Sequence, residues 1–164
     1  MKFPCVIRLD GSDPRVYSRA AEPGEPAVTG TFAFADVDPD ALDRPDQLAF
    51  SGGWLGTESF GRATFVEVAE IGEPAFYQVV ERLARHFVAH YGAPSVTEAL
   101  PVARAECDYA ADLCEHPVHT LLAIERAPDA QGVHERIKVI QPSRAEEHTK
   151  IWQIDEDGDG DGGS

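Results

Sequence analysis

The order of apolar and polar positions along the 164 residues predicts strands near both ends and helices between them. Apolar runs and alternation favour strands at 3–9, 27–37 and 62–71. Later in the chain, 118–127 and 133–141 flank the turn-forming sequence PDAQG, which is typical of a hairpin. Because the strands do not alternate regularly with helices, we expect an α+β fold: an antiparallel sheet of about five or six strands with two main helices packed on one face.

Two segments carry the periodicity of amphipathic helices. In 74–91, apolar residues recur at spacings of four, three and four, at Phe76, Val80, Leu83 and Phe87. The second segment, 95–115, begins with Ser95 and Glu98 in a capping-box pattern. Pro101 lies inside it and predicts a kink or a restart of the helix.

A shorter helix is indicated before the glycine-rich part of the chain. Asp38 is a good N-cap residue and Pro39 suits the first helical position, so a helix over about 39–50 is expected. Pro45 should limit or interrupt it.

The sequence SGGWLGTESFG, 51–61, predicts a tight loop that exposes Trp54 or Phe60. Its glycines resemble those of a phosphate-binding loop, but a strand rather than a helix is expected to follow, and the only nearby base is Arg62. A phosphate cradle is therefore not supported.

The formal charge of −15 is the strongest global feature. A surface of that sign repels phosphate backbones and anionic headgroups, so we expect neither nucleic acid nor membrane as a partner. Five acidic residues lie in the last ten positions. We therefore expect a single globular domain over 1–154 and a disordered acidic tail over 155–164.

No apolar stretch has the length of a signal peptide core or a membrane helix, so a cytoplasmic protein is expected. Three cysteines do not make a disulfide framework, and reduced thiols are predicted.

The stretch CDYAADLCEHPVHT, 107–120, gathers residue types that bind metals. On a continuous helix, Cys107 and Cys114 lie about 10.5 Å apart along the axis, too far to share one zinc ion or a disulfide. With Ala103 and Ala110 they form a core-facing stripe, which favours packing cysteines. No cofactor is therefore expected.

A zinc or iron site remains an alternative. Its ligands would come from two places in the sequence, Cys114, His116 and His119 at the end of the second helix and His86 and His90 on the first. The two histidines have the spacing of ligands on one helical face, but no Glu follows His86 as in hydrolytic zinc helices.

A basic stripe is predicted on the last strand, where His134, Arg136 and Lys138 alternate and Arg126 is expected to join them from the partner strand. Such a stripe would receive an anionic ligand, or pair with Glu125 and Glu135 on a solvated face, which we favour.

The segments MKFPCVIRLDGSD, AAEPGEPAVTGTFAF, SGGWLGTESFG and LCEHPVHTLLAI together resemble a family of small, mostly alphaproteobacterial proteins known as a domain of unknown function. The resemblance covers most of the chain except the acidic tail. It implies a bacterial, single-domain protein and carries over no catalytic or binding residue.

The sequence contains no recognisable motif for a catalytic nucleophile, an acid–base pair or a cofactor. The sequence therefore favours a soluble, non-enzymatic accessory or protein-interaction module with an unidentified protein partner. The alternative is the metal-binding protein or small metalloenzyme described above.

Overall fold

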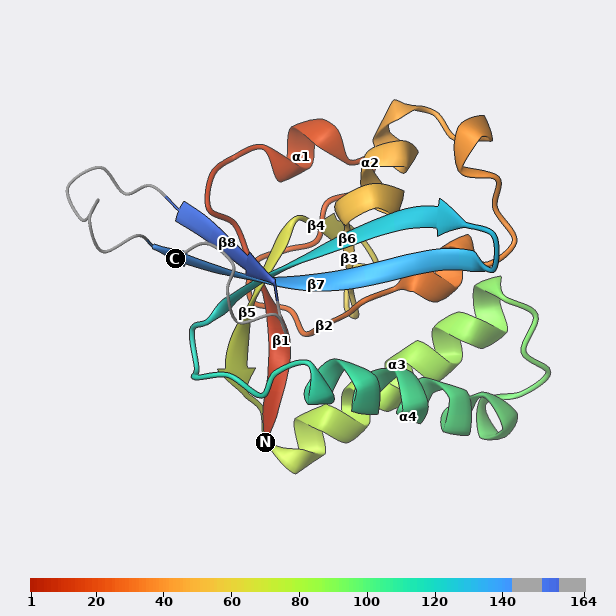
Figure 1. Ribbon diagram of the computed structural model, residues 1–164. Coiled ribbons are helices and arrows are strands. Elements are labelled where there is room, and N and C mark those ends of the chain that lie inside the picture. Colours follow the sequence, from red (N-terminus) through yellow and green to blue (C-terminus); the bar gives the residue numbers. More distant parts are fainter. Residues whose placement is uncertain (143–151, 157–164) are drawn as a thin grey trace.

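The structure is a computed structural model that describes residues 1–142 and 152–156 (Figure 1). In chain order the elements are β1 (Lys2–Ile7), α1 (Asp13–Val16), β2 (Ala27–Val28), the 3₁₀ turns η1 (Thr31–Phe34) and η2 (Pro39–Ala41), α2 (Arg44–Gly52), β3 (Trp54–Gly56), β4 (Arg62–Ala63), β5 (Phe65–Glu70), α3 (Glu73–His90), α4 (Val96–Asp112), β6 (Leu121–Asp129), β7 (Gly132–Pro142) and β8 (Trp152–Glu156).

The described strands form two antiparallel sheets. The main sheet has five strands in the order β1-β5-β6-β7-β8, and the small sheet has three in the order β2-β3-β4. The free edge of β1 is not open: the Val6 N–H donates to the Glu25 carbonyl at 2.9 Å, and the Gly24 N–H donates to the Val6 carbonyl at 2.9 Å. Residues 24–26 thus join the two sheets along β1.

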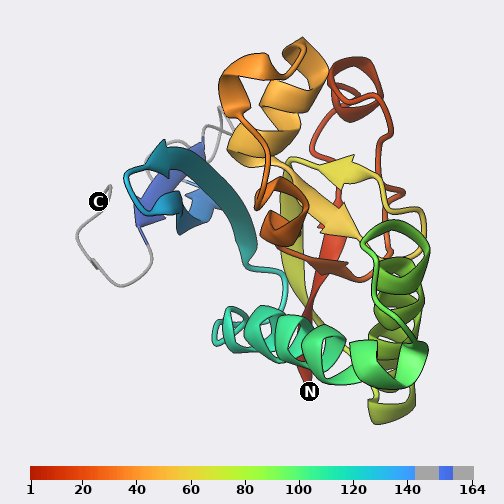
Figure 2. The same cartoon turned by 90° about the vertical axis from the view of Figure 1, so that its right-hand side faces the viewer.

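The helices lie on two sides of the strands. In Figure 1, α3 and α4 pack together below the sheets, whereas α1 and α2 lie above them. Figure 2 shows the same separation from the side. The prediction of two main helices next to one another is confirmed, with 74–91 observed as Glu73–His90 and 95–115 as Val96–Asp112.

Three apolar clusters fill the interior. The first joins α3 and α4 to Phe3, Val28 and Leu55, and it contains the predicted helix stripe. The second lies between the two sheets and includes Trp54 and Val66. The third, with Tyr17, Phe34, Ala49 and Phe50, seats α2. Burial of these three clusters thus holds both sheets and the helices α2, α3 and α4 together.

The Ser95 cap forms as predicted, since the Ser95 hydroxyl accepts a hydrogen bond from the Glu98 N–H at 3.1 Å. A single helix continues through Pro101 and does not restart there. The hairpin is also confirmed, with β6 and β7 paired from Leu121–Ile140 to Asp129–Gly132.

The predicted strand over 27–37 is wrong after its first two residues. Gly30 adopts φ +75, in the left-handed region, and turns the chain into η1. Phe32 and Phe34 therefore do not share a strand face. Phe32 packs on Phe87 of α3, while Phe34 packs on Phe50 of α2.

The predicted helix after Asp38 is displaced along the chain. Asp38 caps only η2, whereas the Asp43 side chain accepts from the Asp46 N–H at 3.0 Å and begins α2. Pro45 lies in the first turn of α2, where its missing N–H has no intrahelical partner to lose. It therefore opens the helix that it was expected to limit.

The expected fold is correct in its coarse form. The chain mixes helices with antiparallel strands, but the described strands divide into two sheets where a single one was predicted. Of the expected acidic tail, Asp155 and Glu156 belong to β8, and 157–164 lie outside the described residues. None of the described helices is long and apolar enough to cross a membrane.

Candidate functional site

The loop 57–61 is held by a buried carboxylate. Glu25 is 3% exposed, and its Oε1 accepts hydrogen bonds from the N–H groups of Glu58 and Ser59 at 2.8 and 2.9 Å. Its Oε2 accepts from the Ser59 hydroxyl at 2.7 Å and from the Glu22 N–H at 2.7 Å. A Cβ at Gly56 would collide with this carboxylate. The glycine is therefore required by close packing beneath the loop.

Phe60, at the end of this loop, is set in an unusual conformation. Its φ is +56, a value that residues with a Cβ rarely adopt. The ring lies flat on the imidazole of His86 from α3, with centroids 3.8 Å apart and planes 1° from parallel. The hydrogen bonds to Glu25 thus hold a strained residue where its ring meets α3.

Arg62, on β4, reaches under the same loop. Its guanidinium donates to the carbonyls of Gly53 at 3.2 Å and Gly30 at 3.3 Å, and it lies over the Phe34 ring at 4.8 Å. Both hydrogen-bond acceptors are neutral, and the described residues give Arg62 no ion-pair partner. Burial and the nearby positive charge of Arg126 lower the pKa of Arg62 to about 9, so it stays charged at neutral pH.

Two adjoining cavities open beside this guanidinium, and we call them together the Arg62 cleft. The larger, of about 420 Å³, is lined by Arg19, Leu55, Phe60, Arg62, His86, His90 and Tyr91. The smaller, of about 210 Å³, is lined by Tyr17, Ser18, Arg19, Phe34, Asp46, Ala49, Phe60 and Arg62. Arg62 lines both cavities, so its guanidinium borders each of them, and we treat the two as one site.

The Arg62 cleft is positive in a molecule that is strongly negative. Of its described lining residues, Asp46 alone is acidic, and it stands against two guanidinium groups, Arg19 and Arg62. Burial, followed by the positive fields of His90 and Arg62, lowers the pKa of His86 to about 4, so this imidazole is neutral at pH 7. The site therefore has an excess of positive charge without protonation of His86.

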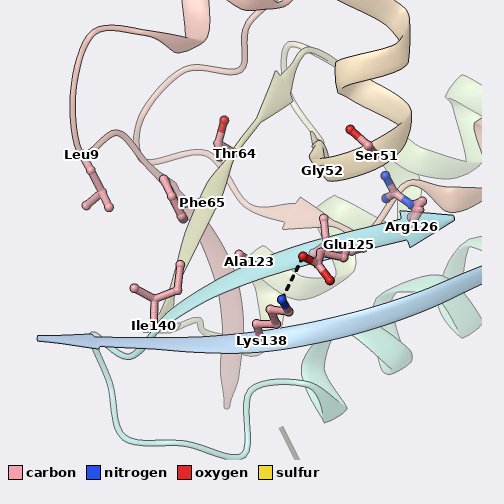
Figure 3. A pocket seen from close by; sticks show the side chains of 11 residues that line it. Leu9, Ser51, Gly52, Thr64, Phe65, Ala123, Glu125, Arg126, Lys138 and Ile140 are labelled. Carbon is pink, nitrogen blue, oxygen red and sulfur yellow. Dashed lines mark hydrogen bonds and ion pairs between the residues drawn. The ribbon is translucent and has the colours of Figure 1, made fainter. Parts of the chain in front are cut away.

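Another pocket lies against the main sheet (Figure 3). Its volume is about 540 Å³, and Leu9, Phe65, Ala123 and Ile140 give it an apolar wall. Its carboxylate is paired: Glu125 accepts from Lys138 at 2.8 Å and from Arg136 at 3.1 Å. These hydrogen bonds lower the pKa of Glu125.

Arg126 does not join the predicted basic stripe. It pairs with Glu135 in the β6–β7 ladder, so its side chain leaves the opposite face from Arg136 and Lys138. The guanidinium is buried under α2 and donates to the carbonyls of Ala49 at 3.2 Å, Phe50 at 3.0 Å and Gly53 at 2.9 Å. Figure 3 shows it directed toward α2, away from Lys138.

The cysteines of 107–120 are packing residues in two different apolar clusters. Cys107 lies in the cluster between α3 and α4, and Cys114 lies in the cluster between the sheets. Both thiols are reduced and buried. Burial raises the pKa of each to about 12, which removes thiolate character near neutral pH.

The proposed metal ligands are not brought together. His86 and His90 lie near the carboxyl end of α3, and their ring centroids are 4.8 Å apart. Cys114 follows the carboxyl end of α4, which runs back along α3, so it lies at the other end of the helix pair (Figure 1). Within the described residues, no three or more His, Cys, Asp or Glu side chains form a group that could hold a metal ion.

The remaining two candidate ligands lie in the turn before β6. The His116 carbonyl accepts from the Lys2 ammonium at 2.7 Å. His119 has φ +77, its N–H donates to the Val68 carbonyl at 2.8 Å, and its Nδ1 is 3.5 Å from Oε2 of Glu67. The zinc or iron alternative stays a prediction.

Three residues of the Arg62 cleft carried no signal that would group them from sequence. Arg19 comes from the loop after α1, Tyr91 follows α3, and Asp46 lies in the first turn of α2. Arg62 was noticed as the base beside the glycine-rich loop, and His86 as half of a histidine pair. Only the fold joins these observations.

One comparison with known proteins gives a result. The model of a family of unknown function, DUF6505, matches residues 1–156. No curated protein and no solved structure matches the chain. Since the match spans both sheets and every residue of the Arg62 cleft, the chain belongs to DUF6505, a family of unknown function.

Proposed function

We propose that the protein is a non-enzymatic binding module that recognises an anionic group in the Arg62 cleft. The observation that carries the proposal is the state of Arg62, a charged guanidinium bonded only to neutral carbonyls beside two cavities. Arg62 is partly buried, and withdrawing a charge from water is costly to the extent that no partner offsets it. An anion entering the cleft supplies that partner.

Two other buried charges, Glu25 and Arg126, support this choice because each is offset by charged or hydrogen-bonding partners. Glu25 receives four hydrogen bonds, and Arg126 lies 3.8 Å from Oε1 of Glu135. The pocket of Figure 3 carries an internally neutralised pair, Glu125 and Lys138. Arg62, in contrast to these groups, has only neutral carbonyls as its hydrogen-bond acceptors among the described residues.

A binding role without chemistry fits the thiols. Burial raises the pKa of Cys5 as well as those of Cys107 and Cys114, so none is an activated nucleophile. The accessory role expected from the sequence takes a definite form here: the anionic group belongs to a molecule that the module recognises.

The test is a titration with sodium benzoate and with inorganic phosphate, followed by backbone amide resonances in NMR spectra at pH 7.5. At least one anion should shift the amides of Phe60, Arg62 and Tyr91 saturably. Arg62→Gln retains an amide donor for the Gly53 carbonyl but removes the charge, and should weaken binding about tenfold or more.

Arg85→Gln is the matched control, because Arg85 is an exposed residue of α3 outside the cleft. Circular dichroism and melting temperature establish that each variant is folded. If neither anion gives saturable shifts, or if Arg62→Gln and Arg85→Gln behave alike, the proposal is wrong.

A further inference from the structure

The Arg62 cleft also indicates which anion it accepts, an inference that rests on the proposed function. We propose that its ligand is a monocarboxylate joined to a flat aromatic ring, carried either by a small aromatic acid or by the carboxyl terminus of a peptide. Three properties of the cleft lead to this class: its charge, the donors left on Arg62, and its walls.

The charge of the lining suits a monoanion. Arg19 and Arg62 oppose Asp46, and His86 is neutral at pH 7, so one positive charge is in excess among these four residues. A dianionic phosphate monoester would bring a second negative charge close to Asp46. Burial and Asp43 already raise the pKa of Asp46, so it is poorly placed to accept another negative neighbour.

The donors left on Arg62 suit a carboxylate. A guanidinium has five N–H groups in a planar fork, and the carbonyls of Gly53 and Gly30 take two of them. The remaining three are in the plane of the fork, which matches the two oxygens of a carboxylate. Arg19 is held nearby because it donates to the Ser59 carbonyl at 3.3 Å.

The walls suit a ring. Phe60 and His86 form a parallel stack, and the Tyr91 ring is tilted against His86 with centroids 5.6 Å apart. Tyr91 is also packed edge-on to Phe32 at 5.3 Å, which fixes the outer side of the cavity. Aromatic rings prefer such edge and offset contacts with another ring. A volume of about 420 Å³ is in the range of small-ligand pockets.

The experiment compares five probes by the same NMR titration at pH 7.5: acetate, benzoate, cyclohexanecarboxylate, inorganic phosphate and phenyl phosphate. Benzoate should bind about tenfold or more tightly than acetate, because the ring adds aromatic contacts. It should also bind more tightly than cyclohexanecarboxylate and phenyl phosphate.

Tyr91→Leu should reduce the preference for benzoate over acetate several-fold. Tyr77→Leu is its matched control, since Tyr77 and Tyr91 are 49% and 46% exposed and only Tyr91 lines the cleft. A tripeptide ending in phenylalanine, compared with its carboxamide, separates the two sources: binding of the free acid alone at benzoate-like affinity identifies a peptide terminus, and binding of neither identifies a small acid.

The two proposals fail in different ways. If no probe binds saturably, anion recognition itself is wrong. If phenyl phosphate or inorganic phosphate binds more tightly than benzoate, or if acetate matches benzoate, the module binds anions but not the proposed class. If Tyr91→Leu and Tyr77→Leu change the preference for benzoate over acetate equally, the benzoate ring does not lie in the cavity lined by Tyr91.

Discussion

Glu25 is the residue on which the shape of the Arg62 cleft depends. Its carboxylate accepts two backbone N–H groups from the loop 57–61, together with the Ser59 hydroxyl. Hydrogen bonds to a charged acceptor are stronger than those between neutral groups. One buried side chain therefore sets the position of Phe60 and, through it, the stack on His86.

Glu25→Gln should lower the free energy of unfolding by about 1–3 kcal/mol, because the amide nitrogen faces donors that need an acceptor. Urea denaturation followed by tryptophan fluorescence measures this change. Glu22→Gln, at a side chain that is 75% exposed, should change stability by less than about 0.5 kcal/mol. Equal effects would mean that the Glu25 contacts are not stabilising.

His86 makes stability depend on pH. Its pKa falls from 6.5 to about 4 on folding, chiefly through burial, so the unfolded chain binds a proton between these values that the folded chain does not. The contribution of neutral His86 is thus complete above pH 6.5 and is lost progressively as the pH falls toward 4.

The measurement compares melting temperatures of the wild type and His86→Gln from pH 7.5 to 4.5. The difference in favour of the wild type should shrink as the pH falls. His134→Gln, at an exposed position of β7, is the matched control for loss of an imidazole. A difference that stays constant over this range would contradict the lowered pKa.

At the scale of elements, α2 is fastened at its carboxyl end by a side chain from β6. The Arg126 guanidinium donates to the carbonyls of Phe50 and Gly53 at the helix end, and it is a second donor to the Ala49 carbonyl, which also accepts from the Gly53 N–H. The Arg126 guanidinium carbon lies 5.5 Å from the centroid of the Phe34 ring, and the guanidinium carbon of Arg62 lies 4.8 Å from the same centroid. Helix α2, η1 and the main sheet thus meet at one buried charge.

Arg126→Met should lower the free energy of unfolding by about 3–5 kcal/mol, because the Phe50 carbonyl loses its charged donor and the mostly buried Glu135 carboxylate loses its ion-pair partner. The double variant Arg126→Met with Glu135→Gln should recover part of that loss. Arg44→Gln, at an exposed position in the first turn of α2, is the control. Chemical denaturation measures the free energy of unfolding of all three variants. A loss below about 1 kcal/mol for Arg126→Met would show that Arg126 does not hold the carboxyl end of α2.

Prediction from sequence succeeded where an element is periodic and capped locally. The stripe of α3 and the Ser95 cap of α4 depend on residues within a few positions, so their pattern is visible in the sequence. Gly30, in contrast, turns the chain at a point where alternation continues; it adopts φ +75, and a Cβ there would lie 2.5 Å from the Leu55 Cβ, so glycine is required by a contact with a distant part of the chain. Local pattern contains no trace of that contact.

The same reason limits prediction of the site. The glycine-rich loop was expected to expose Trp54 or Phe60; Phe60 is partly exposed and lines the Arg62 cleft, but Trp54 is completely buried between the sheets. Its glycines serve close packing, as at Gly53, where a Cβ would lie 2.9 Å from the Ala49 carbonyl oxygen. The spacing of His86 and His90 indicates one helical face and, as the less favoured alternative, a metal site; their neighbours Phe60 and Arg62 come close to them only through the fold.

For the whole molecule, the notable property is the distribution of its charge. The net charge is −15, yet the Arg62 cleft gathers Arg19 and Arg62 around cavities with one described carboxylate. A cleft of one sign with apolar walls raises the local concentration of the opposite ion. The surrounding negative surface favours small or singly charged anions over polyanions, since repulsion grows with the charge of the approaching molecule.

The position of β1, between β5 and residues 24–26, also governs how the chain reaches this structure during synthesis. Lys2 pairs with Glu70, and the other edge of β1 bonds to residues 24–26. Neither set of backbone hydrogen bonds to β1 can form until those later residues have been synthesised. The pairing of β5 with β6 waits until residue 123 has been made. An early strand whose partners are distant folds late and stays open to association with other chains. The yield of folded protein from a ribosome will therefore depend on how residues 2–7 are shielded in that interval.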